Sequence, residues 1–275
     1  MHYYEALEDI LLTAKPKDKI EKFKTFYNNF LNDNIKFENN YIAPVFNKPS
    51  YSSFLKIVKP TSLPEIKNFK SLDGKKYLVH TILHIEYSAI DLALDAALRY
   101  QNMPLEFYKD WLEVANDEIR HFLMLEKLLT SLDGFYGEFE VHKNLFEAAY
   151  NTPDFLSRMA CVPRYLEANG LEQNPKIMQK LNSNKDEFNI KLIEALKIIL
   201  AEEIEHVRKG DFWFKYECKR LNLEPESTYL TIVEKIFPGS TTRKMDLNFE
   251  ARKEAGFSCS ELKKLSKKDD CFKGF

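Results

Sequence analysis

Residues 117–121 read DEIRH and residues 202–206 read EEIEH, so the chain carries one acid-Glu-Ile-x-His pattern twice. In an α-helix, positions i and i+3 share one face, so the glutamate and the histidine of each copy can reach the same ion. Glu118 and Glu203 also lie in stripes of apolar residues, where an ionised carboxylate without a partner is very costly. The pattern therefore predicts two helices that each bind a metal ion on the buried face.

Outward from these motifs, the apolar spacing predicts an all-α protein built on four main helices, and no window has the alternation of a β-sheet. The first two helices are separated by a few residues, which makes them antiparallel neighbours, whereas about twenty residues separate the second from the third. Two helical hairpins joined by a long crossover are typical of the ferritin-like four-helix bundle. The expected helices are 76–101, 104–132, 153–169 and 185–222.

Each helix that carries a Glu-x-x-His motif is preceded in the sequence by a helix with one glutamate placed to bind the same metal site. Glu86 is the sole charge in an apolar stripe and precedes Glu118 by 32 residues, while Glu167 precedes Glu203 by 36. The placement of Glu167 is the weakest, because its helix is short and contains Pro163. The alternative for Glu86 taken alone is a buried ion pair with an arginine or lysine.

The repeat predicts one site with four carboxylates and two imidazoles, the signature of ferritin-like di-iron and di-manganese proteins. Such ligands suit iron or manganese better than a closed thiolate zinc site, so we expect two Fe ions, with Mn as the alternative. Glu118 and Glu203 are the expected catalytic carboxylates, and these two, or another two of the four glutamates, are expected to bridge the ions. The predicted ligands are Glu86, Glu118, His121, Glu167, Glu203 and His206.

Several neighbouring side chains are candidates for a supporting role. Acidic residues beside the ligands can accept the free N–H of a ligand histidine, and flanking tyrosines can shape a pocket; surface solvation and core filling are the alternatives. These candidates are Asp91, Asp117, Glu202, Tyr87 and Tyr165. His80 and His84 lie far around the helix from Glu86 and are expected to be ordinary histidines of its polar face.

The composition narrows the class of protein. The formal charge of the 275 residues is −2. This total favours neither a nucleic-acid binder nor a solvating acidic protein. The flanks 1–75 and 237–275 are slightly basic and the centre is acidic, which suits a cation site and a solvated helical surface equally well. The four cysteines are far apart and lack a CxxC pair, so neither a thiolate zinc site nor a disulfide is expected. The start has no secretory signal and the most apolar stretch, 78–98, is broken by charges, so we expect a cytoplasmic protein with no membrane span.

The extensions are also predicted to be partly helical. Two short helices are expected over 1–13 and 17–32, an irregular proline-containing segment over 38–73, and short helical pieces near 248–255 and 259–267. The expected division is an N-terminal extension (1–75), the di-metal bundle (76–236) and a C-terminal extension (237–275).

The chain resembles the ferritin-like superfamily, and a bacterial ferritin-like family of unknown function in particular. The resemblance is carried by HIE at 84–86 with AIDLALDA at 89–96, by RYLEANGL at 164–171 and by NFEARKEAGFS at 248–258, and it spans about 76–258. The layout of the six ligands is also similar, more distantly, to that of the di-iron tRNA hydroxylase that oxidises an isopentenyl-adenosine side chain. The resemblance implies the fold and the metal, but not the substrate.

The leading functional expectation is an oxidase or hydroxylase that activates dioxygen and acts on an organic substrate, either a small molecule or a tRNA side chain. The electron donor is not predicted, and a homodimer is left open. The first alternative is a ferroxidase or iron-handling protein, although ferritin-type subunits lack such long extensions. The second is a metal-stabilised interaction module.

Overall fold

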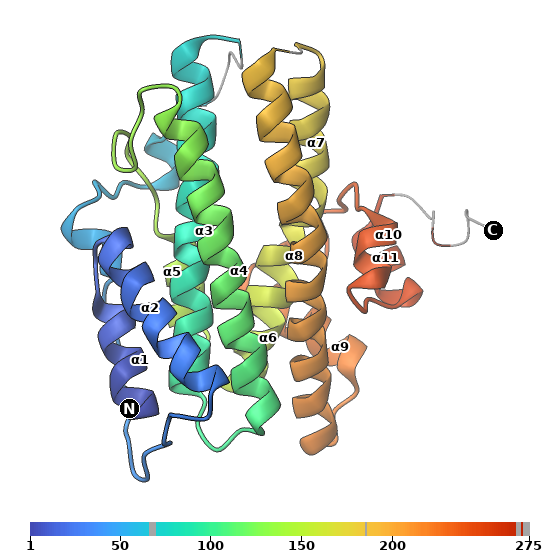
Figure 1. Ribbon diagram of the computed structural model, residues 1–275. Coiled ribbons are helices and arrows are strands. Elements are labelled where there is room, and N and C mark those ends of the chain that lie inside the picture. Colours follow the sequence, from blue (N-terminus) through green and yellow to red (C-terminus); the bar gives the residue numbers. More distant parts are fainter. Residues whose placement is uncertain (66–69, 185, 268–270, 272–275) are drawn as a thin grey trace. The chain divides into compact units, whose positions relative to one another are not determined.

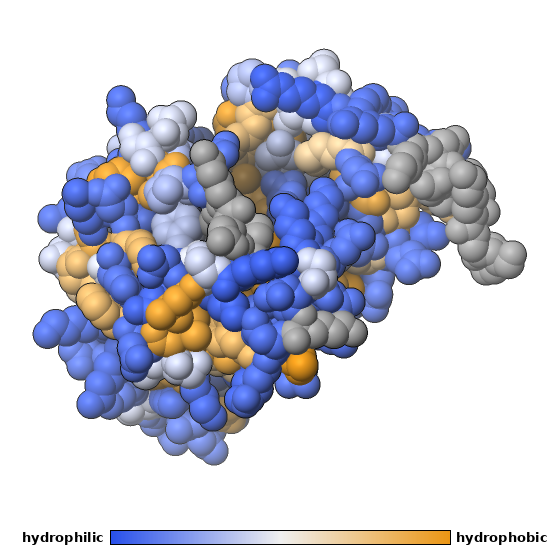
Figure 2. Space-filling model, turned by 90° about the horizontal axis from the view of Figure 1, so that it is seen from above, coloured by the Kyte–Doolittle hydropathy of each residue, from blue (hydrophilic) through white to orange (hydrophobic). Residues whose placement is uncertain are grey.

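The structure is a computed structural model that describes residues 1–65, 70–184, 186–267 and 271. Its regular elements are helices, and beyond them the described residues form only three isolated bridges, which confirms the all-α prediction. The chain divides into two compact units, Met1–Glu147 and Ala148–Phe275. Hydrophilic side chains cover most of the face shown in Figure 2, with smaller hydrophobic areas among them. Among the described helices, none combines the length and the apolar character needed to cross a membrane.

The first unit is built on a hairpin of two long helices, α3 (Leu72–Arg99) and α4 (Leu105–Thr130), which lie side by side in Figure 1. Ser71 caps α3 by accepting a hydrogen bond from the Gly74 N–H at 3.1 Å. Pro104 precedes α4, where its lack of an N–H is harmless. Each helix buries an apolar stripe, and the short connection makes them antiparallel, as the spacing predicted.

The remaining elements of the first unit are shorter. They are α1 (Tyr3–Leu12), α2 (Pro16–Leu31), the 3-10 turns η1 (Ser50–Ser53) and η2 (Pro60–Ser62), and α5 (Asn144–Tyr150), which crosses the boundary between the units. Lys19 of α2 is fully buried and forms an ion pair with Asp91 of α3, and it also donates to the Ser50 hydroxyl at 2.9 Å. The N-terminal segment therefore covers a face of α3 that looks polar in the sequence.

His80 and His84 lie on this covered face, and the expectation that they belong to an exposed polar face is wrong, because both are buried. The Gly137 N–H donates to Nε2 of His80 at 2.9 Å, and Nε2 of His84 lies 2.8 Å from the His142 carbonyl, to which it donates. Nδ1 of His84 is 2.9 Å from the Tyr136 hydroxyl. Burial lowers the pKa of both histidines to about 4. They therefore act as neutral anchors for the segment that follows α4.

The second unit begins with a helical run that changes pitch. It consists of α6 (Phe155–Cys161), the π-helical turn η3 (Val162–Leu166), the 3-10 turn η4 (Glu167–Asn169) and α7 (Gly170–Asn182). The sequence predicted a helix end at Gly170, which is wrong. This glycine has φ −59° and ψ −34°, so it continues the helix instead of turning it.

The long helix α8 (Glu187–Arg220) follows α7 after four residues and packs along it as an antiparallel neighbour. The sequence did not predict α9 (Pro225–Ile236), because Pro225 was interpreted only as a terminator. It occupies the first turn of a new helix, where proline is well tolerated. The Glu224 carboxylate caps that turn by accepting from the Ser227 N–H at 2.7 Å.

The C-terminal tail carries α10 (Phe249–Glu254) and α11 (Cys259–Leu265), close to the helical pieces expected from the sequence. Cys259 and Cys271 form a disulfide, contrary to expectation. The Cα atoms of the two cysteines lie 5.7 Å apart, within the range that a disulfide requires. Cys161 and Cys218 are free and buried.

Candidate metal centre

Three of the predicted ligands meet inside the first unit. Glu86 of α3 faces Glu118 and His121 of α4, and their ligand atoms lie within 4.8 Å of one another. Nδ1 of His121 is 3.1 Å from Oε2 of Glu86 and 3.3 Å from Oε2 of Glu118. All three side chains are buried, because each occupies the core-facing stripe of its helix.

The electrostatics of this cluster reflect two carboxylates sharing one cation. Burial, followed by the charge of Glu118, raises the pKa of Glu86 to about 7. Burial alone would lower the pKa of His121, but its hydrogen bonds to Glu118 and Glu86 and their negative charge raise it to about 12. In the protein without metal, a protonated His121 therefore neutralises part of the acidic pair.

The donor set fits a metal ion. Two carboxylates and a protonated imidazole carry a net negative charge, and a divalent cation that replaces the proton on His121 balances both carboxylates at once. Oxygen donors with one imidazole are the ligands that iron and manganese accept. The buried cluster of Glu86, Glu118 and His121 can therefore hold a metal ion.

The second unit repeats the local arrangement. Glu203 and His206 lie on the buried side of α8, and Nδ1 of His206 is 3.9 Å from Oε2 of Glu203. In both units the histidine thus turns Nδ1 toward the glutamate one helical turn earlier. This is the geometry expected of two residues three positions apart on one helical face.

Glu167 lies on the part of the helical run that packs on α8. A Cβ atom on Gly210 would lie 2.3 Å from Cβ of Pro163, so η3 packs directly on α8 one turn beyond His206. Glu167 begins η4, the next turn of the run, which also packs on α8. It is partly exposed and stands where π-helical geometry changes to 3-10 geometry, an irregularity that is frequent at functional sites.

Comparison with known proteins places this chain in a family. Residues 12–263 match the model of the family described as "Protein of unknown function (DUF455)". The chain belongs to this family. An uncharacterized protein from Haemophilus influenzae is 34% identical over 275 residues, which cover 94% of this chain and 92% of the relative. No solved structure matches the chain. Membership agrees with the resemblance to a family of unknown function. The function must therefore be inferred from the chemistry of the site.

Two of the supporting candidates on α3 have other partners. The Asp91 carboxylate binds Lys19 and accepts from the Ser50 hydroxyl at 2.6 Å, so its role differs from the predicted contact with a ligand histidine. The Tyr87 hydroxyl donates to the Ala14 carbonyl at 2.7 Å. Both residues secure the N-terminal segment on the face of α3 away from Glu86.

The other candidates lie closer to the helix surfaces. Asp117 is paired with Arg120 at 3.1 Å, and Glu202 is partly exposed on α8. The Tyr165 ring stacks on Phe237 with 4.9 Å between centroids, which fits core filling.

Sequence reasoning missed two buried arginines of the second unit, Arg164 and Arg252. The sequence did contain a signal for Arg164, because this charged residue directly follows the apolar run Cys161, Val162 and Pro163. A charge in an apolar run needs partners, and here they come from distant segments.

Proposed function

We propose that this protein is a non-haem di-iron or di-manganese enzyme that activates dioxygen and oxidises an organic substrate. The observation that carries the proposal is the buried cluster of Glu86, Glu118 and His121, together with the second Glu-x-x-His pair of α8. In this proposal α3, α4, the run 155–182 and α8 form a ferritin-like bundle. Each histidine would then bind one ion, and two of the four carboxylates would bind both.

The proposed ligands have different roles at the metal site. Glu118 and Glu203 would be shared by the two ions, Glu86 and Glu167 would each bind one ion, and His121 and His206 would hold one ion each. A pair of iron ions would supply the electrons and the Lewis acidity that dioxygen activation needs. The apolar stripes around the glutamates exclude water and keep the carboxylates oriented.

The substrate is proposed as a small organic molecule or a tRNA side chain, the latter only by analogy and from the slightly basic flanks. Iron handling is the competing function, because a ferroxidase would use similar ligands with Fe(II) itself as substrate. The two differ in stoichiometry, since an iron store oxidises many ions per chain.

The deciding experiment adds graded Fe(II) to anaerobic protein, admits dioxygen, and measures iron oxidised per chain, the optical spectrum and the mass in solution. The enzyme should oxidise about two Fe(II) per chain and then require electrons. His206→Ala should reduce the metal content to one ion per chain. Continued oxidation far beyond two ions in a large assembly would replace the proposal by iron storage, and protein that takes up no metal would contradict both.

A further inference from the structure

Arg252, in the C-terminal tail, is buried and reaches the helical run that contains Glu167. Its Nε and Nη2 donate to the Glu172 carboxylate at 2.7 and 2.9 Å, and Nη2 also donates to the Ala168 carbonyl at 3.2 Å. Asn248 adds a hydrogen bond from its side-chain amide to the Leu171 carbonyl at 3.2 Å. The tail therefore holds the backbone immediately after Glu167.

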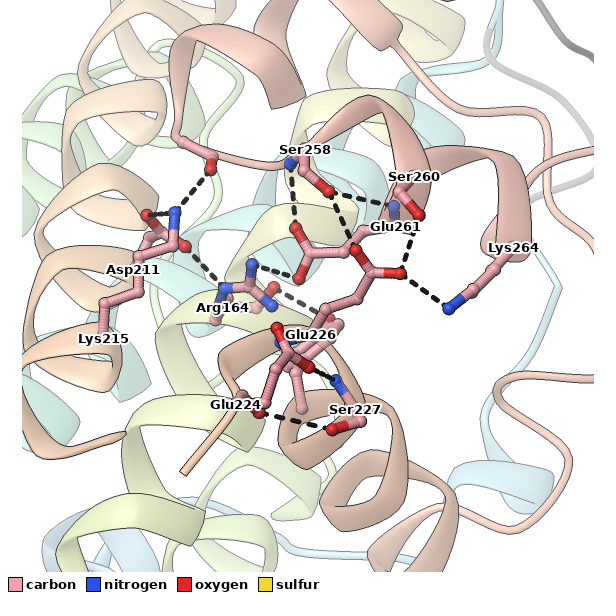
Figure 3. A network of polar contacts seen from close by, with 12 residues as sticks. Arg164, Asp211, Lys215, Glu224, Glu226, Ser227, Ser258, Ser260, Glu261 and Lys264 are labelled. Atoms are coloured by element: carbon pink, nitrogen blue, oxygen red, sulfur yellow. Dashed lines mark hydrogen bonds and ion pairs between the residues drawn. The ribbon is translucent and has the colours of Figure 1, made fainter. Parts of the chain in front are cut away.

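Arg164 is held by the same part of the chain on the other side of Glu167. Its Nε donates to Asp211 at 2.7 Å and its Nη2 to Glu261 of α11 at 2.6 Å, as Figure 3 shows. The guanidinium carbon lies 4.0 Å from the centroid of Tyr229 and 4.4 Å from that of Phe257. Aromatic faces and carboxylates together offset the cost of burying this cation.

The Arg164 and Arg252 clusters share the ring of Phe257 and lie on either side of the turn that contains Glu167. Phe257 lies 4.4 Å from the Arg164 guanidinium and 5.1 Å from that of Arg252. Between them, the run passes from π to 3-10 geometry, a change that weakens regular backbone hydrogen bonding. Side chains of the tail supply the restraint that the helix itself lacks there.

We propose that Arg252 is a positioning residue for Glu167: through Glu172 and the Ala168 carbonyl it fixes the turn, so that the Glu167 carboxylate is held ready for the second metal ion. This inference rests on the proposed two-metal function. The C-terminal tail then belongs to the metal site without supplying a ligand, as outer contacts do in other metal proteins.

The test is a double-mutant cycle read by Mn(II) binding to the full-length protein, with free Mn(II) counted by electron paramagnetic resonance. Glu167→Gln identifies the dependent ion by weakening its binding. Arg252→Ala should weaken the same ion about tenfold or more and leave the other unchanged. The double variant should bind no more weakly than Glu167→Gln alone, since both changes remove one contribution. Arg99→Ala, which removes a similar arginine pair with Asp95 in the first unit, should leave both ions unchanged.

The outcomes separate the two proposals. Wild-type protein that binds fewer than two Mn(II) overturns the proposed function and this inference with it. Wild-type protein that binds two, with both affinities retained in Arg252→Ala, overturns only the positioning role. The positioning role is also overturned if Arg252→Ala weakens both ions equally or adds its full effect to that of Glu167→Gln, because it would then act through general stability. If Arg252→Ala does not fold, Arg252→Lys keeps the charge and removes the planar fork, and the same cycle applies.

Discussion

Replacing Glu118 by glutamine should separate metal binding from folding. In the protein without metal, raising the pKa of Glu86 to about 7 corresponds to about 3 kcal/mol, and its largest cause is burial, which the substitution leaves in place. Removing the Glu118 charge relieves only the part that is due to repulsion, and it weakens the contact with His121 by about 1–2 kcal/mol. These effects nearly cancel, so the free energy of unfolding measured with a chelator should stay within about 1 kcal/mol of wild type.

With metal the two proteins should differ. At a free Mn(II) concentration one hundred times its Kd, a site specific for the native state adds about 2.7 kcal/mol, or roughly 5–10 °C in Tm. Wild-type protein should show this shift in thermal unfolding monitored by circular dichroism, and Glu118→Gln should lose most of it. Glu113→Gln, an exposed change on the same helix, is the matched control and should keep it. An equal metal-induced shift in Glu118→Gln and wild type would refute the assignment of this cluster as the ion site.

Three further changes test the surrounding structure. The pKa values of His80 and His84 lie near 4 in the folded protein, so the unfolded chain takes up protons first as the pH falls. The free energy of unfolding, measured with urea, should be at its full value above pH 6.5 and should be lower by roughly 2 kcal/mol per histidine at pH 5. A urea midpoint that does not change with pH would contradict this. Lys19→Met strands the buried Asp91 charge and should cost about 3–5 kcal/mol at pH 7, whereas a neutral effect would mean that the pair is solvated. Gly256→Ala combines φ +102° with a Cβ placed 2.3 Å from a carboxylate oxygen, so it should lower the free energy of unfolding by about 2–4 kcal/mol in chemical denaturation; a wild-type midpoint would show that the tail adjusts freely.

Much of the first unit was predictable because its information is local. The apolar spacing on α3 and α4 determines which face each helix buries, and it brings Glu86 onto the same face as the apolar residues. The three-residue spacing of Glu118 and His121 then places both groups one turn apart on that face. The cluster of these three residues follows from helix geometry and one short connection.

The role of the other face of α3 was not predictable in this way. His84 and Asp91 look like residues of a polar, solvated stripe, but the segment after α4 binds His84 and the N-terminal segment binds Asp91. Their identity is compatible with either environment, because a hydrogen bond to water and one to the chain satisfy the same atoms. Only contacts between residues distant in the sequence distinguish the two cases.

The sequence alone determined the helical class, the two Glu-x-x-His helices and the Glu and His side chains that could hold a metal ion, because these depend on periodicity and on residue type. Only the tertiary structure showed the backbone geometry and the packing around Glu167 in the second unit. The sequence predicted one helix over 153–169, but a π-helical turn that contains Pro163 and a 3-10 turn interrupt the α-helix there, and Gly170 continues the helical run beyond the expected end. The position of Glu167 depends on the close approach of Gly210 and on side chains some eighty residues later in the tail, such as Arg252. The conformation of this turn depends on the free energy of the whole packed structure, and a local sequence pattern cannot encode that free energy.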